Sequence, residues 1–259
     1  MAKRGKAALY AAALAAYAFL YVPLVIVVLF SFSASRLGTQ WAGFTLGWYV
    51  MLLHDADMLH AAWNSLVIAL AASLAAIVFG TLAALATHKY RLRFLPVLVL
   101  APLSTPDILQ GVSLLVFFVL LNVSLGLRSI MLAHTSFCIA YVAIVVSSRL
   151  AGMDPSLVEA ARDLGASPWK GFWLVTLPLL VPGILAGGLL AFTMSIDDFV
   201  ITFFTAGAGT STLPLRIYTM IKVAVTPEVN AVSTLLMALT LVLVISISRL
   251  APQALKGMG

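Results

Sequence analysis

The sequence contains little charge. Only 9% of its 259 residues are charged, whereas 63% are hydrophobic. A soluble domain carries about 25% charged and about 45–50% apolar residues, so this apolar surplus cannot be buried in one soluble core. The lipid bilayer is therefore the expected solvent. The net charge of +6 does not indicate a nucleic-acid partner, because the basic residues flank apolar runs instead of forming a stripe.

Groups that carry chemistry are also scarce. Cys138 is the sole cysteine, which excludes an intrachain disulfide and a cysteine-based metal cluster. The sequence has no glycine-rich loop followed by Lys-Ser or Lys-Thr and no nucleophile–base cluster. We therefore predict a protein that is not an enzyme, does not hydrolyse ATP and holds no metal or cofactor of its own. Four dispersed histidines lack metal-ligand spacing, and we interpret them as interfacial: His54, His60, His88 and His134.

Long apolar segments predict helices that cross a membrane. A span needs about 20 helical residues for about 30 Å of hydrocarbon, and its backbone must be hydrogen-bonded internally. We therefore predict an all-α, polytopic membrane protein with a single domain, residues 1–259. The first segment follows basic residues as a signal peptide would, but it exceeds the about 7–15 residues of a signal sequence's apolar core and is interpreted as a retained span. The six predicted spans are 9–31, 64–87, 95–121, 129–148, 179–204 and 230–250.

The basic residues predict the orientation of these spans. Under the six-span model, the loops on one side carry Arg36, Arg128, Arg216 and Lys222. The other side holds most of the positive charge: Lys3, Arg4, Lys6, Lys89, Arg91, Arg93, Arg149, Arg162, Lys170, Arg249 and Lys256. Because basic loops stay in the cytoplasm, both termini are expected there.

The predicted cytoplasmic loop, residues 149–178, has the pattern of two short helices around a glycine. Asp154-Pro155 is typical of a helix start, and Gly165 suits the left-handed position that ends a helix. Ser167-Pro168 is expected to begin a second helix, which Leu177-Pro178 would end. The first helix is amphipathic. Its apolar face could rest on lipid headgroups or insert into a groove on a partner, and spacing alone leaves both readings open.

One motif in this loop resembles a known family. Glu159-Ala160-Ala161, three residues, Gly165, nine residues, Val175, one residue and Leu177-Pro178 resemble the EAA motif of binding-protein-dependent ABC importer permeases, with Val175 where isoleucine is usual. The resemblance implies a type I (MetI-like) permease fold. It also implies a loop that docks on a separate ATPase, which binds the ATP and Mg. The implied coupling residues are Glu159, Ala160, Ala161, Leu164, Gly165, Leu177 and Pro178.

A second resemblance covers nearly the whole chain. It is to permeases of spermidine/putrescine importers, and it rests on Phe32-Ser33, Trp41-x-Gly43-Phe44-Thr45, Trp48-Tyr49, Pro106-Asp107, Asp154, Ser195-x-Asp197-Asp198, Leu213-Pro214 and Pro227-Glu228-Val229-Asn230-Ala231. The resemblance implies polyamine import across a bacterial inner membrane. The implied partners are a cytoplasmic ABC ATPase dimer, a second related permease and an extracytoplasmic polyamine-binding protein. The alternatives are an ABC permease for another small solute and, less favoured, an ion-coupled secondary transporter, since no internal inverted repeat is visible.

Acidic residues inside predicted spans indicate a pathway, because charge is costly in lipid. Asp107 follows three prolines in the third span, which is expected to be broken there, so Asp107 could cap the break, line a pathway or do both. Asp197 and Asp198 lie near the outer end of the fifth span and diverge by about 100° on a helix, so both cannot face one pathway equally. Solvation at the membrane interface is the alternative role for this pair. Carboxylates with nearby aromatic rings suit ammonium groups. The candidate pathway residues are Asp107, Ser195, Asp197, Asp198 and Phe199.

Overall fold

The computed structural model describes residues 2–35, 40–90, 94–224 and 226–250. Arg36, Arg91, Arg93 and Lys256, which entered the orientation argument, lie outside the described residues, as do the side chains of Lys3 and Arg4. The described residues form helices and loops, with one isolated bridge between Ser33 and Phe44.

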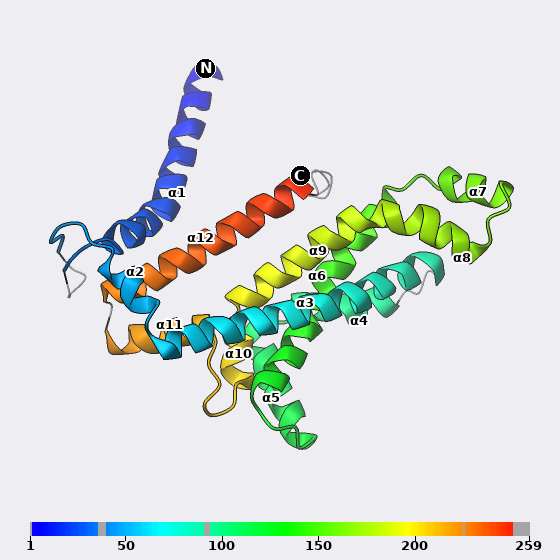
Figure 1. Ribbon diagram of the computed structural model, residues 1–259. Coiled ribbons are helices and arrows are strands. Elements are labelled where there is room, and N and C mark those ends of the chain that lie inside the picture. Colours follow the sequence, from blue (N-terminus) through cyan, green and yellow to red (C-terminus); the bar gives the residue numbers. More distant parts are fainter. Residues whose placement is uncertain (1, 36–39, 91–93, 225, 251–259) are drawn as a thin grey trace. The chain divides into compact units, whose positions relative to one another are not determined.

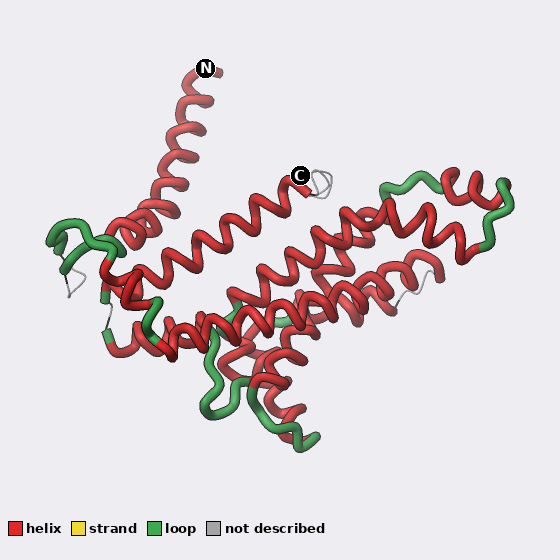
Figure 2. Tube along the Cα trace, viewed as in Figure 1, coloured by secondary structure: helices red, strands yellow, loops and turns green. Residues whose placement is uncertain are grey.

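The helices follow the apolar segments of the sequence (Figures 1 and 2). They are α1 (Ala2–Phe30), α2 (Gly47–Leu52), α3 (Ala56–Tyr90), α4 (Phe94–Ser104), α5 (Asp107–Leu120), α6 (Leu127–Ala151), α7 (Ser156–Asp163), α8 (Pro168–Gly171), the π-helical turn η1 (Phe172–Thr176), α9 (Leu177–Asp197), α10 (Val200–Thr205), α11 (Leu213–Val223) and α12 (Pro227–Leu250).

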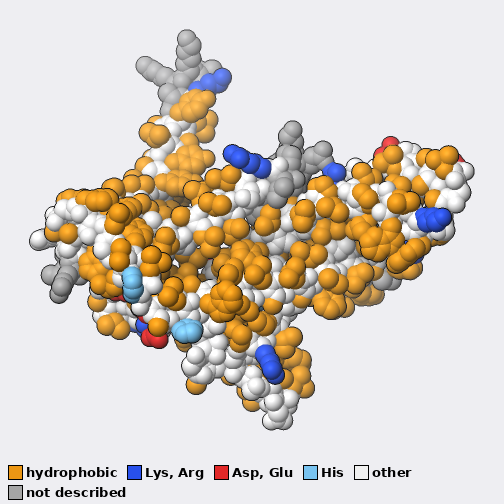
Figure 3. Space-filling view, viewed as in Figure 1, with side chains coloured by type: hydrophobic (Ala, Val, Ile, Leu, Met, Phe, Trp, Pro, Cys, Tyr) orange, Lys and Arg blue, Asp and Glu red, His pale blue; other side chains and the backbone are white. Residues whose placement is uncertain are grey.

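Within the described part of the chain, five helical segments are long and apolar enough to span a membrane. The pair α4 and α5 adds a sixth span if this bent pair is counted as one. Hydrophobic side chains cover most of the visible face in Figure 3, and charged ones are sparse on it. Water disfavours an apolar outer surface, whereas lipid favours it. Together with the helices, this surface confirms the all-α, multi-span fold class.

The chain divides into two units, residues 1–59 with 216–239 and residues 60–215 with 240–259. In the first unit, side-chain hydrogen bonds hold the segment after α1. The Ser31 and Tyr49 hydroxyls are 2.7 Å apart, and the Trp48 indole donates to the Ser33 carbonyl at 2.8 Å. Asp57 and Arg216 form an ion pair at 3.2 Å.

The second unit has its core between α6 and α9, which pack along each other. Small residues of α9 allow this approach, since a Cβ added at Gly187 would meet the Val142 backbone at 3.2 Å. The Cys138 thiol donates to the Ala191 carbonyl at 3.4 Å, and both residues are fully buried. The core therefore aligns α9 with α6 over the part of both helices that leads to the cavity at the end of α9.

The predicted break in the third span is present. Helix α4 ends at Ser104, α5 begins at Asp107, and the two axes bend by 108°. Pro106 explains the bend because it lacks an N–H and disfavours a helical conformation at Thr105. Pro106 is itself the N-cap of α5, so Asp107 lies in the first turn, near the positive end of the helix dipole.

The fifth span differs from the prediction at both ends. A continuous helix was expected over 179–204, but α9 ends at Asp197 and the short α10 follows from Val200. The second loop helix was expected to end at Leu177-Pro178, and this was wrong. Instead α8, η1 and α9 form one helical segment, Pro168–Asp197. The π turn just before Pro178 widens the helix where the proline ring would meet the preceding turn.

Gly80 of α3 tests the packing of the second unit. A Cβ at Gly80 would lie 2.8 Å from the Ile139 carbonyl oxygen of α6, whereas one at Gly171 of α8 would meet nothing within 4 Å. Alanine gains about 1 kcal/mol of helix propensity at either site, but overpacking costs about 1–3 kcal/mol. We expect Gly80→Ala to lower the unfolding temperature in detergent relative to Gly171→Ala. Equal unfolding temperatures would contradict this packing.

Candidate functional site

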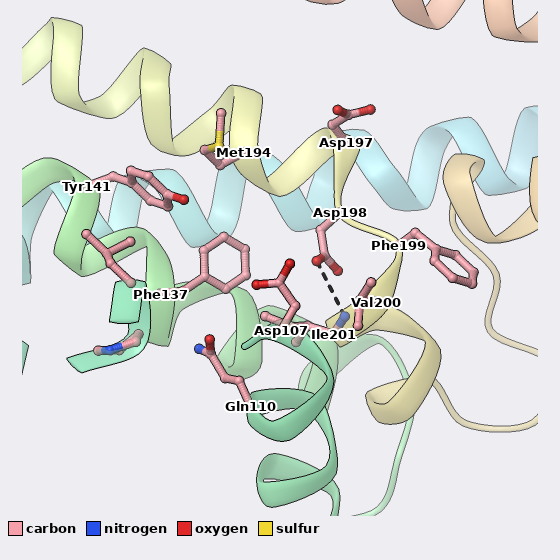
Figure 4. Close-up of a pocket in the computed structure, with 12 residues that line it drawn as sticks. Asp107, Gln110, Phe137, Tyr141, Met194, Asp197, Asp198, Phe199, Val200 and Ile201 are labelled. Carbon is pink, nitrogen blue, oxygen red and sulfur yellow. Dashed lines mark hydrogen bonds between the residues drawn. The ribbon is translucent and has the colours of Figure 1, made fainter. Parts of the chain in front are cut away.

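A cavity of about 320 Å³ opens in the second unit where both broken spans meet (Figure 4). The bend between α4 and α5 supplies one wall, the break between α9 and α10 supplies another, and α6 contributes aromatic side chains. The lining residues are Pro102, Leu103, Asp107, Gln110, Phe137, Tyr141, Met194, Asp197, Asp198, Phe199, Val200 and Ile201. The two helix breaks thus bring together residues that are far apart in the sequence.

The cavity has acidic walls. Of the candidate pathway residues, Asp107, Asp197, Asp198 and Phe199 all line it, and no lysine or arginine is among the described lining residues. Figure 4 shows the carboxylates of Asp107 and Asp198 directed toward one another, while that of Asp197 turns away from both. The cavity therefore concentrates negative charge between two of its walls, an arrangement that attracts cations and repels anions.

Aromatic residues also belong to the cavity lining. Phe137 and Tyr141 of α6 and Phe199, at the helix break, are in the lining. A ring face attracts an ammonium group through its quadrupole, by about 0.5–2 kcal/mol depending on desolvation. Carboxylates and rings together form a surface suited to an organic cation, whose methylene groups also need apolar contact.

Asp198 lies at the break itself and explains why the helix stops there. Its backbone is extended, with ψ 127°, and its carboxylate caps α10 by accepting from the Thr202 N–H at 2.8 Å. The Thr202 hydroxyl donates to the same oxygen at 3.0 Å. The carboxylate replaces the backbone partner that this N–H group of α10 loses at the break. Asp198, which was expected inside a continuous helix, therefore acts as a cap for α10.

His134 is a functional candidate that the sequence interpretation missed. It was expected at an interface, but it is 1% exposed inside α6, and its Nε2 lies 3.2 Å from Asp198 Oδ2. Ser195, expected in the pathway, does not line the cavity. It is buried, and its hydroxyl lies 2.7 Å from Nδ1 of His134. A polar histidine in an apolar span was the available signal, since such residues are rare in lipid.

The 149–178 loop forms the second candidate site, and its local chemistry follows the sequence. Asp154 accepts from the Ser156 N–H at 2.9 Å at the start of α7. This backbone bond, with the Ser156 side chain, holds the pKa of the Asp154 carboxyl below its usual value. After α7 the Gly165 N–H donates to the Arg162 carbonyl at 2.8 Å, and Ala166 donates to Ala161 at 3.0 Å. This pair of bonds is the Schellman motif.

Gly165 makes the bend between the loop helices possible. Its φ is +83°, a left-handed conformation that costs a residue with a Cβ about 1–2 kcal/mol. Ser167 then caps α8 by accepting from the Lys170 N–H at 3.4 Å. The predicted arrangement of helix, glycine and helix is therefore present, and the second helix continues into α9.

The loop presents both charge and apolar surface. Glu159, Ala160, Leu164, Gly165 and Pro178 are exposed, while Ala161 and Leu177 are half-buried. Large apolar side chains also stand open: Leu164 is 90% exposed, Leu174 73% and Trp169 69%. Exposed apolar groups of this size, next to charged ones, are typical of a surface that another molecule covers.

The fold and the loop motif together define a class of protein. Residues 76–255 match the family model described as "Binding-protein-dependent transport system inner membrane component". The chain belongs to this family and is a permease subunit of an ABC importer, a membrane transport component and not an enzyme.

Particular relatives match along most of the chain. The sequence is 42% identical over 248 residues to the spermidine/putrescine transport system permease protein PotC of Shigella flexneri, covering 95% of this chain and 94% of that one. It is 44% identical over 232 residues to the putrescine transport system permease protein PotI of Escherichia coli, covering 85% and 82%. The resemblance to permeases of polyamine importers is thereby confirmed.

A solved structure supports the fold. A chain in the crystal structure of a bacterial ABC transporter involved in the import of the acidic polysaccharide alginate aligns with a TM-score of 0.76, at 17% identity and 96% coverage of both chains. The expectation of a MetI-like permease fold is confirmed.

Gln110 offers a direct test of the charge in the cavity. It lines the cavity from α5, and the sole native cysteine, Cys138, is buried and provides an unreactive background. We expect Gln110→Cys to react about tenfold faster with an ethylammonium methanethiosulfonate than with its sulfonatoethyl counterpart, because the carboxylates concentrate the cation. Each rate is divided by that of the same reagent with a free small thiol. A ratio near one would show that the cavity does not select by charge.

Proposed function

We propose that the cargo of this permease is a polyamine and that the carboxylate-lined cavity lies on its translocation path. The observation that carries the proposal is that three aspartates and three aromatic residues line one cavity, and that the described lining residues include no lysine or arginine. The relatives named for spermidine and putrescine transport support the same cargo.

The chemistry of the cargo fits these walls. A polyamine carries several ammonium groups separated by methylenes. Its binding surface therefore needs negative charges at intervals and apolar contacts between these charges. Two opposite unit charges about 4 Å apart attract by about 4 kcal/mol at an effective dielectric constant of about 20. An anionic solute would meet repulsion of the same order. The cavity volume is also at the lower end of the about 300–1,000 Å³ of small-molecule sites, which suits a thin, flexible chain.

The complete importer would contain further subunits. We place the 149–178 loop and both termini in the bacterial cytoplasm, with the loop docked in a groove of an ABC ATPase dimer that binds ATP and Mg. A second, related permease would complete the path, since six spans supply half of it. An extracytoplasmic polyamine-binding protein would deliver the cargo. The coupling residues are the seven implied by the loop motif, of which Glu159, Ala160, Leu164, Gly165 and Pro178 are exposed to a partner.

Transport would proceed by alternating access between two states. ATP-driven closure of the ATPase dimer moves the loop, and the spans open outward to receive cargo from the binding protein. Hydrolysis then restores the inward-open state. The ATPase can bias the cavity in this way only if its contacts with the loop differ between the two states.

Asp198→Asn tests the cavity. The asparagine oxygen can still accept from Thr202, so the cap remains while the charge is lost. In proteoliposomes that hold the full importer, we expect the KM for spermidine uptake to rise roughly tenfold, because one favourable charge pair is removed. Thr210→Ala, in the loop before α11, is the control. If both variants transport alike, Asp198 has no role in the pathway.

Glu159→Lys tests the docking loop. Glu159 is exposed on α7, so its reversal should leave folding and membrane insertion intact while it repels the complementary surface of the ATPase. We expect uptake and co-purification of the ATPase to be lost. The matched reversal Arg128→Glu, at an exposed position near the start of α6, should keep both. Normal uptake by Glu159→Lys would refute the coupling role.

A further inference from the structure

The two oxygens of the Asp198 carboxylate have different surroundings. Oδ2 accepts from the Thr202 N–H at 2.8 Å and the Thr202 hydroxyl at 3.0 Å, and it lies 3.2 Å from Nε2 of His134. Oδ1 has a single long hydrogen bond in the described structure, from the Ile201 N–H at 3.4 Å. The protein thus occupies one oxygen almost fully and leaves the other with lone pairs for a ligand.

His134 fixes this arrangement from a neighbouring helix. Its ring is buried in α6, with Nδ1 2.7 Å from the Ser195 hydroxyl of α9 and Nε2 3.0 Å from the Thr202 hydroxyl of α10. The imidazole therefore joins three helices at the break where Asp198 lies. When Nε2 carries a proton, it donates toward Asp198 Oδ2, and Ser195 sets the orientation of the ring from the other side.

We propose that His134 is a positioning residue for cation binding: it holds the Asp198 carboxylate against the cavity wall, with Oδ1 left for an ammonium group of the cargo. His134 itself is absent from the cavity lining, so its effect on the cargo passes through Asp198. The proposal rests on the proposed function, because it assumes a cationic cargo in this cavity.

The physical basis is the loss of one of the three donors that hold Oδ2 of the Asp198 carboxylate. Without the imidazole, the Asp198 side chain loses a charge-assisted hydrogen bond and can turn away from the orientation that faces Asp107 in Figure 4. Bonds to charged groups are worth enough to change affinity roughly tenfold. A purely structural role for His134, as a polar brace between helices, would instead change the amount or thermal stability of the importer.

A double-mutant cycle separates these two roles. The variants are His134→Ala, Asp198→Asn and their combination, each in the complete importer in proteoliposomes with its binding protein and with spermidine as the probe. We expect His134→Ala to raise the KM of uptake roughly tenfold, with the maximal rate within about twofold of wild type. The double variant should match Asp198→Asn within about twofold, because His134 acts through a charge that is already gone.

Two further variants sharpen the test. His134→Gln should restore most of the affinity, because its amide can donate from near the position of Nε2. His60→Asn, at an exposed histidine at the start of the second unit, should behave as wild type. Ser195→Ala removes the bond to Nδ1 and is the test to use if His134→Ala does not assemble. It should raise KM in the wild-type background and leave it unchanged in Asp198→Asn.

Several results would overturn the proposal. Additive losses in the double variant, or an unchanged KM in His134→Ala or in an assembled Ser195→Ala, would show that His134 does not act through Asp198. An Asp198→Asn variant with wild-type KM would instead refute the proposed role of the cavity. A raised KM for Asp198→Asn beside an unchanged KM for His134→Ala would reject the role of His134 alone.

Discussion

The hydrogen bonds around the Asp198 carboxylate are the interaction on which the cavity depends. A charge within an apolar span is costly unless donors surround it, and here Thr202 and His134 contribute them. The same carboxylate ends α9 and caps α10, so the group that needs solvation also creates the break. The cavity wall and the charge that it presents therefore have one common origin.

The bend at Pro106 complements this break from the opposite wall. It places Asp107 in the first turn of α5, where unpaired backbone N–H groups make a negative charge favourable. Each of the two facing carboxylates is thus supported by a helix start, one through a cap and one through the helix dipole. In the proposed path, cargo can then bind by electrostatic attraction, and neither carboxylate is left unsupported when the cavity is empty.

The sequence predicted those features whose causes are local. Pro106 predicted the bend of the third span. Asp154, Gly165 and Ser167 predicted where the loop helices begin and end, because caps and left-handed turns depend on neighbouring residues. Long apolar runs predicted the spans for a similar reason. The three aspartates were selected because charge in a span is rare, and they and Phe199 line one cavity, whereas Ser195 does not. Their role in a pathway stays a prediction.

The features that the sequence did not predict depend on distant partners. No proline or glycine stands at Asp198-Phe199, so nothing local signalled a break there, and the Thr202 and His134 contacts that explain it require the folded arrangement. His134 was missed for the same reason: metal-ligand spacing was the pattern tested, whereas its partners lie on α9 and α10. Pro178 led to the opposite error. It predicted the end of a helix, but the π turn η1 accommodates the proline and the helix continues.

The continuity of the helix through Pro178 bears on the proposed coupling between the 149–178 loop and the cavity. The helical segment Pro168–Asp197 runs without interruption from the 149–178 loop to the cavity wall, and at about 1.5 Å per residue it is long enough to connect the two sides of a bilayer. If the helix had ended at Leu177-Pro178, the loop could move without moving α9. In a continuous helix packed along α6, a displacement at the loop end must instead move residues next to Asp198 or deform the α6–α9 core. Close-packed cores resist deformation, so the less costly response is a movement at the helix break, where the hydrogen bonds of Asp198 and His134 are located.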